Sequence, residues 1–120
     1  MVLFLIDLLL LVRTTVHGIY RDPEFRAITV LMFLLHSGGT LFYCQVEHWS
    51  IVDALYFCVM TISTVGYGDL IPHGGLSKMF TIGFTIFGIG LFASFVGKLV
   101  VLRIQLHRSA ISAHHHGRSE

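Results

Sequence analysis

A short apolar segment that runs into a glycine-spaced loop decides the fold of this chain: residues 51–69 have the sequence IVDALYFCVMTISTVGYGD. The apolar part, Ile51–Ser63, has 13 residues, which as a helix would extend about 20 Å. The hydrocarbon core of a bilayer is about 30 Å thick, so this segment cannot cross a membrane. Ser50 followed by Asp53 is a capping-box pattern, which predicts a helix that begins near Ile51.

Apolar stretches that are long enough to cross a membrane lie on both sides of this segment. Ala27–Val46 has 20 residues and Met79–Gly97 has 19, and neither contains Asp, Glu, Lys or Arg. Each would extend about 30 Å as a helix. Of all 120 residues, 54% are hydrophobic and 12% are charged, which is too few charges to cover a small soluble globule. The composition therefore indicates a membrane protein, and the net charge of +1 gives no reason to expect nucleic acid.

The basic residues predict the orientation of the chain. Of the eight Lys and Arg residues, only Lys78 lies between the two spans. We therefore expect a multi-pass protein of the cell membrane with both termini cytoplasmic and the connection external. The short helix would enter from outside and stop midway. Irregular backbone at that depth must be buried in protein or line water, so the residues after Ser63 are expected to line a water-filled path.

Five regions follow from this topology. They are an N-terminal interfacial helix (1–20), an outer transmembrane helix (24–46), the short helix with its loops (47–75), an inner transmembrane helix (76–106) and a polar cytoplasmic tail (107–120). The apolar run Met1–Val12 is too short to span, so we place it in the interface, with a signal peptide as the alternative. Asp22–Pro23 is expected to separate it from the first span. We interpret His114–His116 as a disordered or foreign tail, with metal binding as the alternative.

The loop residues Thr64–Gly68 suit the coordination of a cation by backbone oxygens. A potassium ion gives up its hydration shell only where oxygens replace it on all sides, and rings of carbonyls do so without fixed charge. Pointing successive carbonyls at one axis requires alternating backbone conformations, some with positive φ. Gly66 and Gly68 adopt positive φ at little cost, whereas Val65 would not. The alternative is an inert glycine turn.

The hexamer Thr64–Val65–Gly66–Tyr67–Gly68–Asp69 resembles the potassium-channel signature in full. The two-span arrangement is similar to bacterial pore-only potassium channels, and a similarity to NaK-type bacterial cation channels extends over roughly residues 1–106. The resemblance implies an all-α membrane protein: a homotetramer of two transmembrane helices per chain with a re-entrant pore helix. Four stacked K⁺ sites would be formed by the carbonyls of the filter and by one hydroxyl, the residues being Thr64, Val65, Gly66 and Tyr67. It implies no cofactor other than the permeant K⁺, and as partners only membrane lipids, K⁺ and copies of the chain.

Two positions depart from this resemblance. NaK-type channels are non-selective and carry an acidic residue at the position of Tyr67, so this filter resembles the selective family. Many selective channels carry two tryptophans where this chain has Tyr56 and Phe57, and Phe57 has no polar hydrogen to donate to Tyr67. Met60 stands where some relatives carry a carboxylate bonded to the Asp69 position, although ordinary packing explains Met60 equally well. Filter support is expected from these four residues: Tyr56, Phe57, Met60 and Asp69.

The resemblance makes Gly88 the hinge of the inner helix. Close packing against Gly39 of a neighbouring helix is the alternative reason for a glycine there. Helical spacing from this hinge predicts an inner gate, an apolar sleeve that closes by dewetting; its lining would be Phe92, Val96, Val100 and Ile104. The alternative is that this stripe faces lipid. Lys98 is expected to reach headgroups and water, which would place Val96 and Val100 on other faces.

The sequence therefore predicts the pore of a potassium-selective channel that conducts passively. It does not predict an enzyme, because no nucleophile–base pair or carboxylate pair is placed for catalysis. Two alternatives are a non-selective Na⁺/K⁺ channel on the same scaffold and a non-conducting membrane interaction subunit. The chain ends soon after Lys98, so we expect a cytoplasmic regulatory domain either to be lacking or to lie outside this chain.

Overall fold

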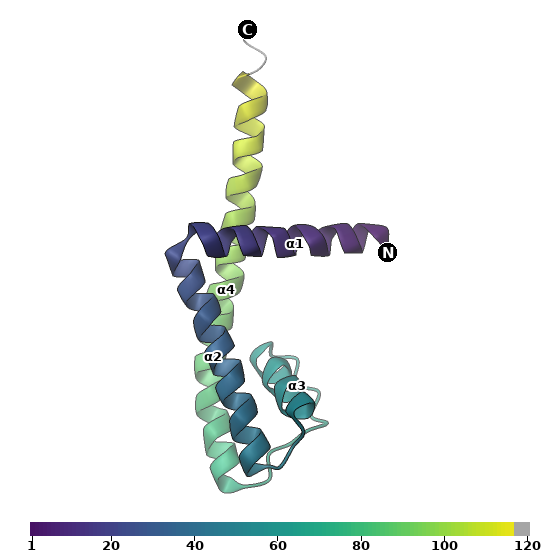
Figure 1. Ribbon diagram of the computed structural model, residues 1–120, viewed down its shortest axis with the longest axis vertical. Helices are drawn as coiled ribbons and strands as arrows, with labels where there is room; N and C mark the ends of the chain where they lie inside the picture. Colours follow the sequence, from purple (N-terminus) through teal and green to yellow (C-terminus); the bar gives the residue numbers. More distant parts are fainter. Residues whose placement is uncertain (117–120) are drawn as a thin grey trace. The chain divides into compact units, whose positions relative to one another are not determined.

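The computed structural model describes residues 1–116 and the side-chain surroundings of residues 1–113 (Figure 1). This part of the chain is built from four helices, namely α1 (Val2–Arg21), α2 (Pro23–Val46), α3 (Ile51–Ile62) and α4 (Gly75–His116). Of these, α1, α2 and α4 are long and apolar enough to cross a membrane. The predicted all-α class is confirmed. The helices form two compact units, Ile28–Ser94 and Met1–Ala27 with the chain from Phe95 onward.

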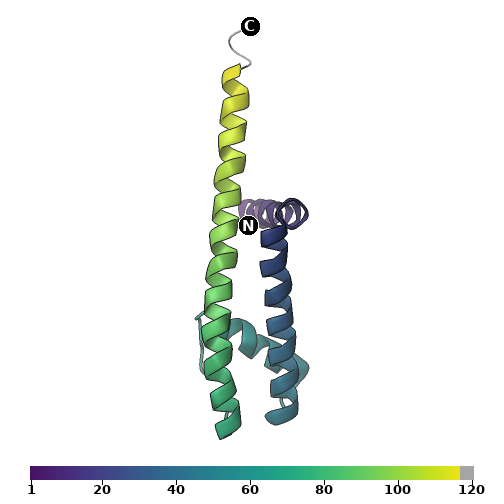
Figure 2. The same ribbon diagram turned by 90° about the vertical axis from the view of Figure 1, so that its left-hand side faces the viewer.

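In the unit Ile28–Ser94, α2 and α4 run antiparallel and side by side, and α3 packs beside them (Figures 1 and 2). The buried core joins all three helices, through Tyr43, Ala54, Cys58, Ile62 and Phe84. Gly39 permits the close approach: a Cβ atom there would lie 2.6 Å from the Phe84 ring and 2.9 Å from the Cys58 sulfur. The tight junction of the three helices thus depends on the missing side chain at Gly39.

The start of α3 agrees with its capping signal. The Ser50 hydroxyl accepts a hydrogen bond from the Asp53 backbone N–H at 3.1 Å, and the helix begins at Ile51 as predicted. A capping residue of this type satisfies an N–H group that lacks a partner within the helix. The helix has 12 residues and extends about 18 Å, so α3 is too short to cross a bilayer.

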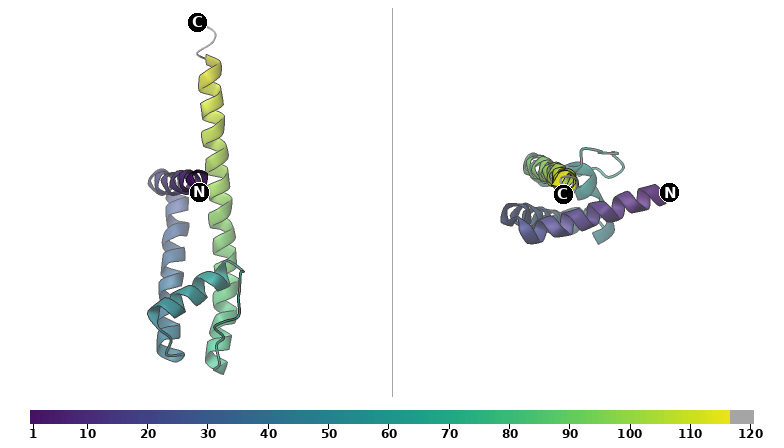
Figure 3. Two further views of the ribbon diagram at one scale, coloured as in Figure 1. Left: turned by 90° about the vertical axis from the view of Figure 1, so that its right-hand side faces the viewer. Right: turned by 90° about the horizontal axis from the view of Figure 1, so that it is seen from above.

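In the other unit, α1 continues to Arg21, and α2 begins at Pro23, as the Asp22–Pro23 step predicts. With 20 residues, α1 is long enough to span, so the length argument made from Met1–Val12 is wrong. Its interfacial position stays a prediction. α1 lies across the C-terminal part of α4 rather than along it (Figures 1 and 3). Gly18 is buried at this crossing, where an added Cβ would lie 2.7 Å from Leu102 Cδ1.

The helix α4 is longer than the sequence pattern indicated. It has 42 residues and continues to His116, so the polar tail predicted for 107–120 is helical over residues 107–116. The physical reason is that no glycine or proline occurs between Lys98 and His116, and nothing else in the segment interrupts helical hydrogen bonding. The backbone of His114–His116 is thus helical, which contradicts a disordered tail there. The side chains of these histidines and residues 117–120 lie outside the part described, so a foreign origin and metal binding stay predictions.

Candidate functional site

The backbone of the loop after α3 alternates in conformation at every second residue. Positive φ values occur at Thr64 (62°), Gly66 (49°) and Gly68 (73°), and not at Val65 or Tyr67. This is the alternation expected for Gly66 and Gly68 from their spacing. It is the conformation that turns successive carbonyl groups toward one side of a chain.

Thr64 is the residue of this alternation that sequence reasoning missed. A left-handed conformation in a β-branched residue is a genuine outlier, and such strain of about 1–3 kcal/mol persists only where the surroundings over-determine it. The loop is tied to the end of α3 by two hydrogen bonds: Thr64 N–H donates to the Thr61 carbonyl, and Gly66 N–H donates to the Met60 carbonyl, both at 3.1 Å. Thr64 stands two residues before Gly66, so the two-residue period was the signal that could have indicated it.

The four residues expected to support this loop act in different ways. Met60 accepts the Gly66 N–H with its backbone carbonyl, a role that does not depend on its side chain. The Tyr56 hydroxyl interacts with the carboxylate of Asp69. Phe57 packs within its own subunit, with its ring 4.9 Å from that of Tyr43. The structure therefore brings Tyr56, Met60 and Asp69 to the loop and uses Phe57 to anchor α3.

An aromatic cluster around Tyr43 holds α3 against the two long helices. The Tyr43 side chain is fully buried, and its hydroxyl shares a 2.7 Å hydrogen bond with the Thr81 hydroxyl of α4. The ring of Trp49 stacks on Tyr43 at 5.4 Å and meets the ring of Phe57 at 5.2 Å. Aromatic pairs at these separations contribute about 0.5–1.5 kcal/mol each beyond the area they bury. The cluster therefore holds α3, and with it the start of the loop that follows α3, in a fixed position against α2 and α4.

Glu47 follows directly after α2 and binds the backbone just before α4, where the loop that follows α3 ends. Its Oε1 accepts hydrogen bonds from the backbone N–H groups of His73 (3.1 Å) and Gly74 (3.3 Å). The carboxylate side chain is only 7% exposed, and its Oε2 lies 3.4 Å from Nδ1 of His73. The Ser77 hydroxyl beside it and these amides lower the pKa of Glu47 from 4.5 to about 2, more than burial raises it. Sequence reasoning missed this link, because the partners are 26 and 27 residues apart.

We expect Glu47→Gln to lower the thermal stability of the protein, because amide donors bind a charged acceptor more strongly than a neutral one. The folded-state pKa lies below 4.5, so the contribution is fully present above pH 4.5 and is lost as the pH falls toward about 2. Thermal unfolding in detergent, followed by circular dichroism from pH 7 downward, measures this. The difference between wild type and variant should shrink across that window.

Asp7→Asn on α1 is the matched control, since Asp7 is an exposed residue far from Glu47 in sequence and in the other unit. A Glu47→Gln protein as stable as the Asp7→Asn protein at pH 7 would contradict the structural role of this carboxylate.

Gly88 of α4 packs against Ile62, the last residue of α3. A Cβ atom at Gly88 would lie 2.6 Å from Cγ1 and 2.9 Å from Cδ1 of Ile62, and 3.5 Å from Cδ2 of Leu35. The partner proposed from the sequence, Gly39, contacts Phe84 and Cys58 instead. Close packing is therefore present at Gly88, but with the C-terminal end of α3 in the same chain. The hinge stays a prediction.

The four residues predicted to line a gate lie in different surroundings. Phe92 is partly buried against the core cluster of its own chain, whereas the others are exposed in the described part, with fractions of 41% for Val96, 52% for Val100 and 51% for Ile104. The role of these residues as a gate stays a prediction.

Lys98 does not reach outward as expected. Its ammonium group pairs with Asp22 at 3.4 Å and with Glu24 at the start of α2. These two acids offer the charge a partner within the protein, which the sequence argument from headgroups did not consider. Lys98 nevertheless marks the face of α4 turned to α1 and α2. Val100 lies two residues further on, so it faces roughly the other side of the helix.

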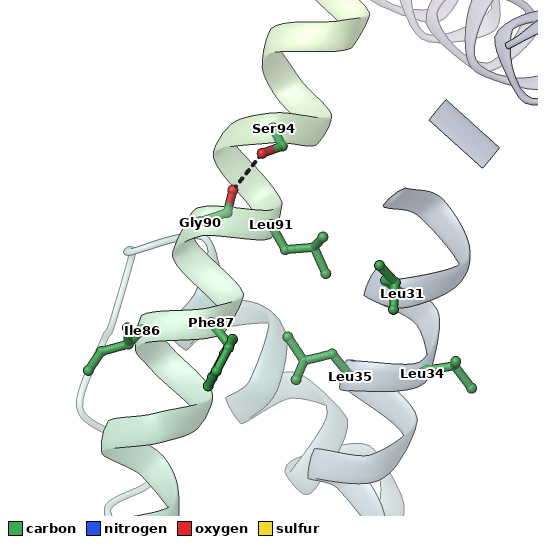
Figure 4. A pocket seen from close by; sticks show the side chains of 8 residues that line it. All are labelled: Leu31, Leu34, Leu35, Ile86, Phe87, Gly90, Leu91 and Ser94. Atoms are coloured by element: carbon green, nitrogen blue, oxygen red, sulfur yellow. Dashed lines mark hydrogen bonds between the residues drawn. The ribbon is translucent and has the colours of Figure 1, made fainter. Parts of the chain in front are cut away.

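A shallow groove of about 660 Å³ lies between α2 and α4 in the unit Ile28–Ser94 (Figure 4). Leu31, Leu35 and Leu91 point into the space between the helices (Figure 4). The hydroxyl of Ser94 donates to the Gly90 carbonyl at 2.9 Å, so its proton is already used in a hydrogen bond. None of the eight lining residues is charged, so this groove has no chemistry for catalysis or ion binding. The loop after α3 is the candidate site.

Comparison with known proteins identifies a family and several relatives. A family model described as "Ion channel" matches residues 29–103. The chain is 39% identical over 84 residues to "Two pore potassium channel a" of Oryza sativa subsp. japonica, covering 64% of this chain and 24% of that protein. It is 34% identical over 88 residues to "Potassium channel protein 1" of Methanocaldococcus jannaschii, covering 73% of this chain and 26% of that protein. The chain spans about a quarter of the length of these curated relatives.

A solved structure described as a calcium-activated cation channel from Tsukamurella paurometabola is also similar. The TM-score is 0.65 with 34% sequence identity, and the match covers 78% of this chain and 88% of that one. A second structure with the same values is described as a calcium-activated non-selective cation channel.

Proposed function

This chain belongs to the ion channel family, and from that premise we propose that four copies of it form a potassium-selective pore in the cell membrane. It is a membrane protein and a channel rather than an enzyme. The proposal adds three points: the assembly, the selectivity for K⁺, and an orientation with both termini in the cytoplasm. The orientation is supported by the eight basic residues: seven lie before residue 27 or after residue 97, and only Lys78, in the first turn of α4, lies beside the connection between α2 and α4.

The observation that carries the proposal is the alternation of positive φ at residues 64, 66 and 68. Carbonyl groups of Thr64, Val65, Gly66 and Tyr67, with the Thr64 hydroxyl, would replace the hydration shell of K⁺ in rings of four. No cofactor is needed, because the ion itself is the cargo. The Tyr67 side chain is 72% exposed in the single chain, which leaves it available for contacts with neighbouring subunits.

The selectivity is tested by reconstituting the protein in a planar bilayer and measuring the reversal potential. With K⁺ on one side and an equal concentration of Na⁺ on the other, we expect the potential to shift strongly in the direction that K⁺ diffusion dictates. A reversal potential that stays at zero would instead establish a non-selective cation pore. The absence of any Rb⁺ flux into liposomes would leave a non-conducting membrane subunit as the function.

Tyr67→Asp is expected to erode the preference for K⁺, because a charged side chain at the outer end of the filter places fixed charge where only carbonyl dipoles stood. The same reversal-potential measurement checks it. His48→Asp adds the same charge in the exposed turn after α2, outside the filter loop, and should leave the preference unchanged. Equal selectivity in wild type and Tyr67→Asp would argue against a filter at this position.

We propose that Val96, Val100 and Ile104 line a narrow apolar sleeve on the cytoplasmic side. Serine in place of Val100 should wet this sleeve and raise the resting K⁺ leak, since hydrophobic constrictions close by dewetting. Leu99→Ser is the matched control, because Leu99 is less exposed than its neighbour and lies about 100° around the helix. Rb⁺ uptake into liposomes compares the two, and equal leaks would show that the pore face has been assigned wrongly.

A further inference from the structure

A small pocket with a cationic lining lies where α1 crosses the C-terminal part of α4. Its volume is about 290 Å³, and it is lined by Leu10, Arg13, Thr14, His17 and Leu106. The four residues from α1 stand at positions i, i+3, i+4 and i+7, so they occupy one face of that helix. None of these residues belongs to the proposed filter or the proposed gate.

The charge of Arg13 has no counter-ion among the described residues. Among the described residues, the ion pairs join His73 to Glu47 and Lys98 to Asp22 and Glu24, and none includes Arg13 or His17. Lys98 already engages the two acids at the junction of α1 and α2. The pocket lining contains no carboxylate. The site therefore attracts an anion from outside the chain.

The donors of the pocket suit a phosphate group. A guanidinium group offers parallel N–H donors that match two phosphate oxygens, and an imidazole adds a donor one helical turn away. Thr14 adds none, because its hydroxyl donates to the Leu10 carbonyl at 2.7 Å. Recognition of an anion would come from Arg13 and His17.

The rest of the pocket suits a phosphate that carries an apolar chain. Leu10 and Leu106 form walls that a free hydrated phosphate would not use. The rest of α1 also suits contact with lipid, since apolar side chains such as Leu3 (78% exposed) and Leu9 (69% exposed) are not covered by protein in the described part. A helix that lies in the interface holds its basic residues at the level of the headgroups.

We propose that this pocket binds the phosphate of an anionic phospholipid. Arg13 and His17 hold the headgroup, and Leu10 and Leu106 contact the glycerol and the first part of the acyl chain. Bound there, the lipid would contact α1 and α4 together and so fix their crossing. The inference needs only the packing of α1 on α4, so it stands or falls separately from the function proposed above.

The test uses the purified full chain in neutral detergent, with phosphatidylglycerol, phosphatidylcholine and inorganic phosphate as three separate probes. Native mass spectrometry measures retained lipid, and the thermal unfolding midpoint measures stabilisation. Wild type should bind phosphatidylglycerol more tightly than phosphatidylcholine. Arg13→Gln should weaken phosphatidylglycerol binding about tenfold or more, the effect of losing a charge-assisted hydrogen bond, and His17→Gln should weaken it less. Arg13 is exposed, so its replacement should leave the fold intact.

Arg21→Gln is the matched control, because Arg21 lies on the same helix outside the pocket lining. An equal loss of binding in Arg21→Gln and Arg13→Gln would mean unspecific attraction and would overturn the proposal. So would displacement of the lipid by millimolar inorganic phosphate that stabilises the protein equally well, since free phosphate would then be the ligand.

Discussion

Replacing Gly66 by alanine is expected to abolish ion flux while the protein still folds. Gly66 has φ of 49°, a conformation that costs an alanine about 1–2 kcal/mol, or about 4–8 kcal/mol over the four subunits of the proposed tetramer. A Cβ at this position meets no described atom within 4 Å, so the penalty is backbone strain and not a clash. The loop should relieve this strain by turning a carbonyl away from the axis. Rb⁺ flux into liposomes measures the loss, and the thermal unfolding midpoint checks the fold.

The matched control is Gly38→Ala. Gly38 also meets nothing within 4 Å, but it lies inside α2 without positive φ, so alanine should fit there and flux should persist. Wild-type flux through Gly66→Ala would show that positive φ at this position is not required for conduction. The proposed filter would then be wrong.

The parts of the fold that could be predicted depend on residues that are close in sequence. Ser50 and Asp53 are three residues apart and define the start of α3, while the Asp22–Pro23 step ends α1 and begins α2. The spacing of Gly66 and Gly68 indicated the alternating backbone of the loop. In each case the physical cause is a local property of the backbone, either a missing N–H, a capped N–H or access to positive φ.

The contacts that could not be predicted join residues far apart in the chain. Glu47 binds backbone groups 26 and 27 residues away, and Lys98 bonds to Glu24 across 74 residues. Each of these side chains has several plausible partners from sequence alone, such as water and headgroups, and only packing selects among them. The Lys98 prediction was wrong for this reason. The end of α4 was misplaced for another, because polar residues such as Gln105 and Arg108 favour a helix as readily as a tail.

Two explanations compete for the presence of a glycine at position 88, a hinge in α4 and close packing against α3, and a single experiment separates them. The hinge explanation predicts that the channel opens less often in Gly88→Ala, whereas the contact of Gly88 with Ile62 predicts that the added methyl group overpacks the core. The added methyl would lie 2.6 Å from Ile62 Cγ1, and Ile62 is only 1% exposed, so it has little room to move. Overpacking of this kind costs about 1–3 kcal/mol per subunit. Ile62 ends α3, two residues before Thr64, so its displacement should also disturb the loop.

We therefore expect Gly88→Ala to lower both the thermal unfolding midpoint and the Rb⁺ flux. Gly90→Ala is the matched control on the same helix, since a Cβ at Gly90 meets nothing within 4 Å. The thermal unfolding midpoint and the Rb⁺ flux of Gly90→Ala should both be close to those of the wild type. Ile62→Ala removes the atoms that the new methyl would strike, so Gly88→Ala should cost less stability in the Ile62→Ala background than it costs in the wild type. Residues in contact usually show coupling of about 0.5–3 kcal/mol in such a cycle.

The two explanations differ in the double variant. If Gly88 matters because it packs against Ile62, Gly88→Ala costs little further stability or flux once Ile62→Ala is present, and the Gly90→Ala and Ile62→Ala pair shows no coupling. If Gly88 matters as a hinge, Gly88→Ala keeps its thermal midpoint, loses flux, and gains nothing from Ile62→Ala, because alanine stiffens the helix whatever lies opposite it. The second pattern would refute the packing role and leave the hinge as the reason for a glycine at this position.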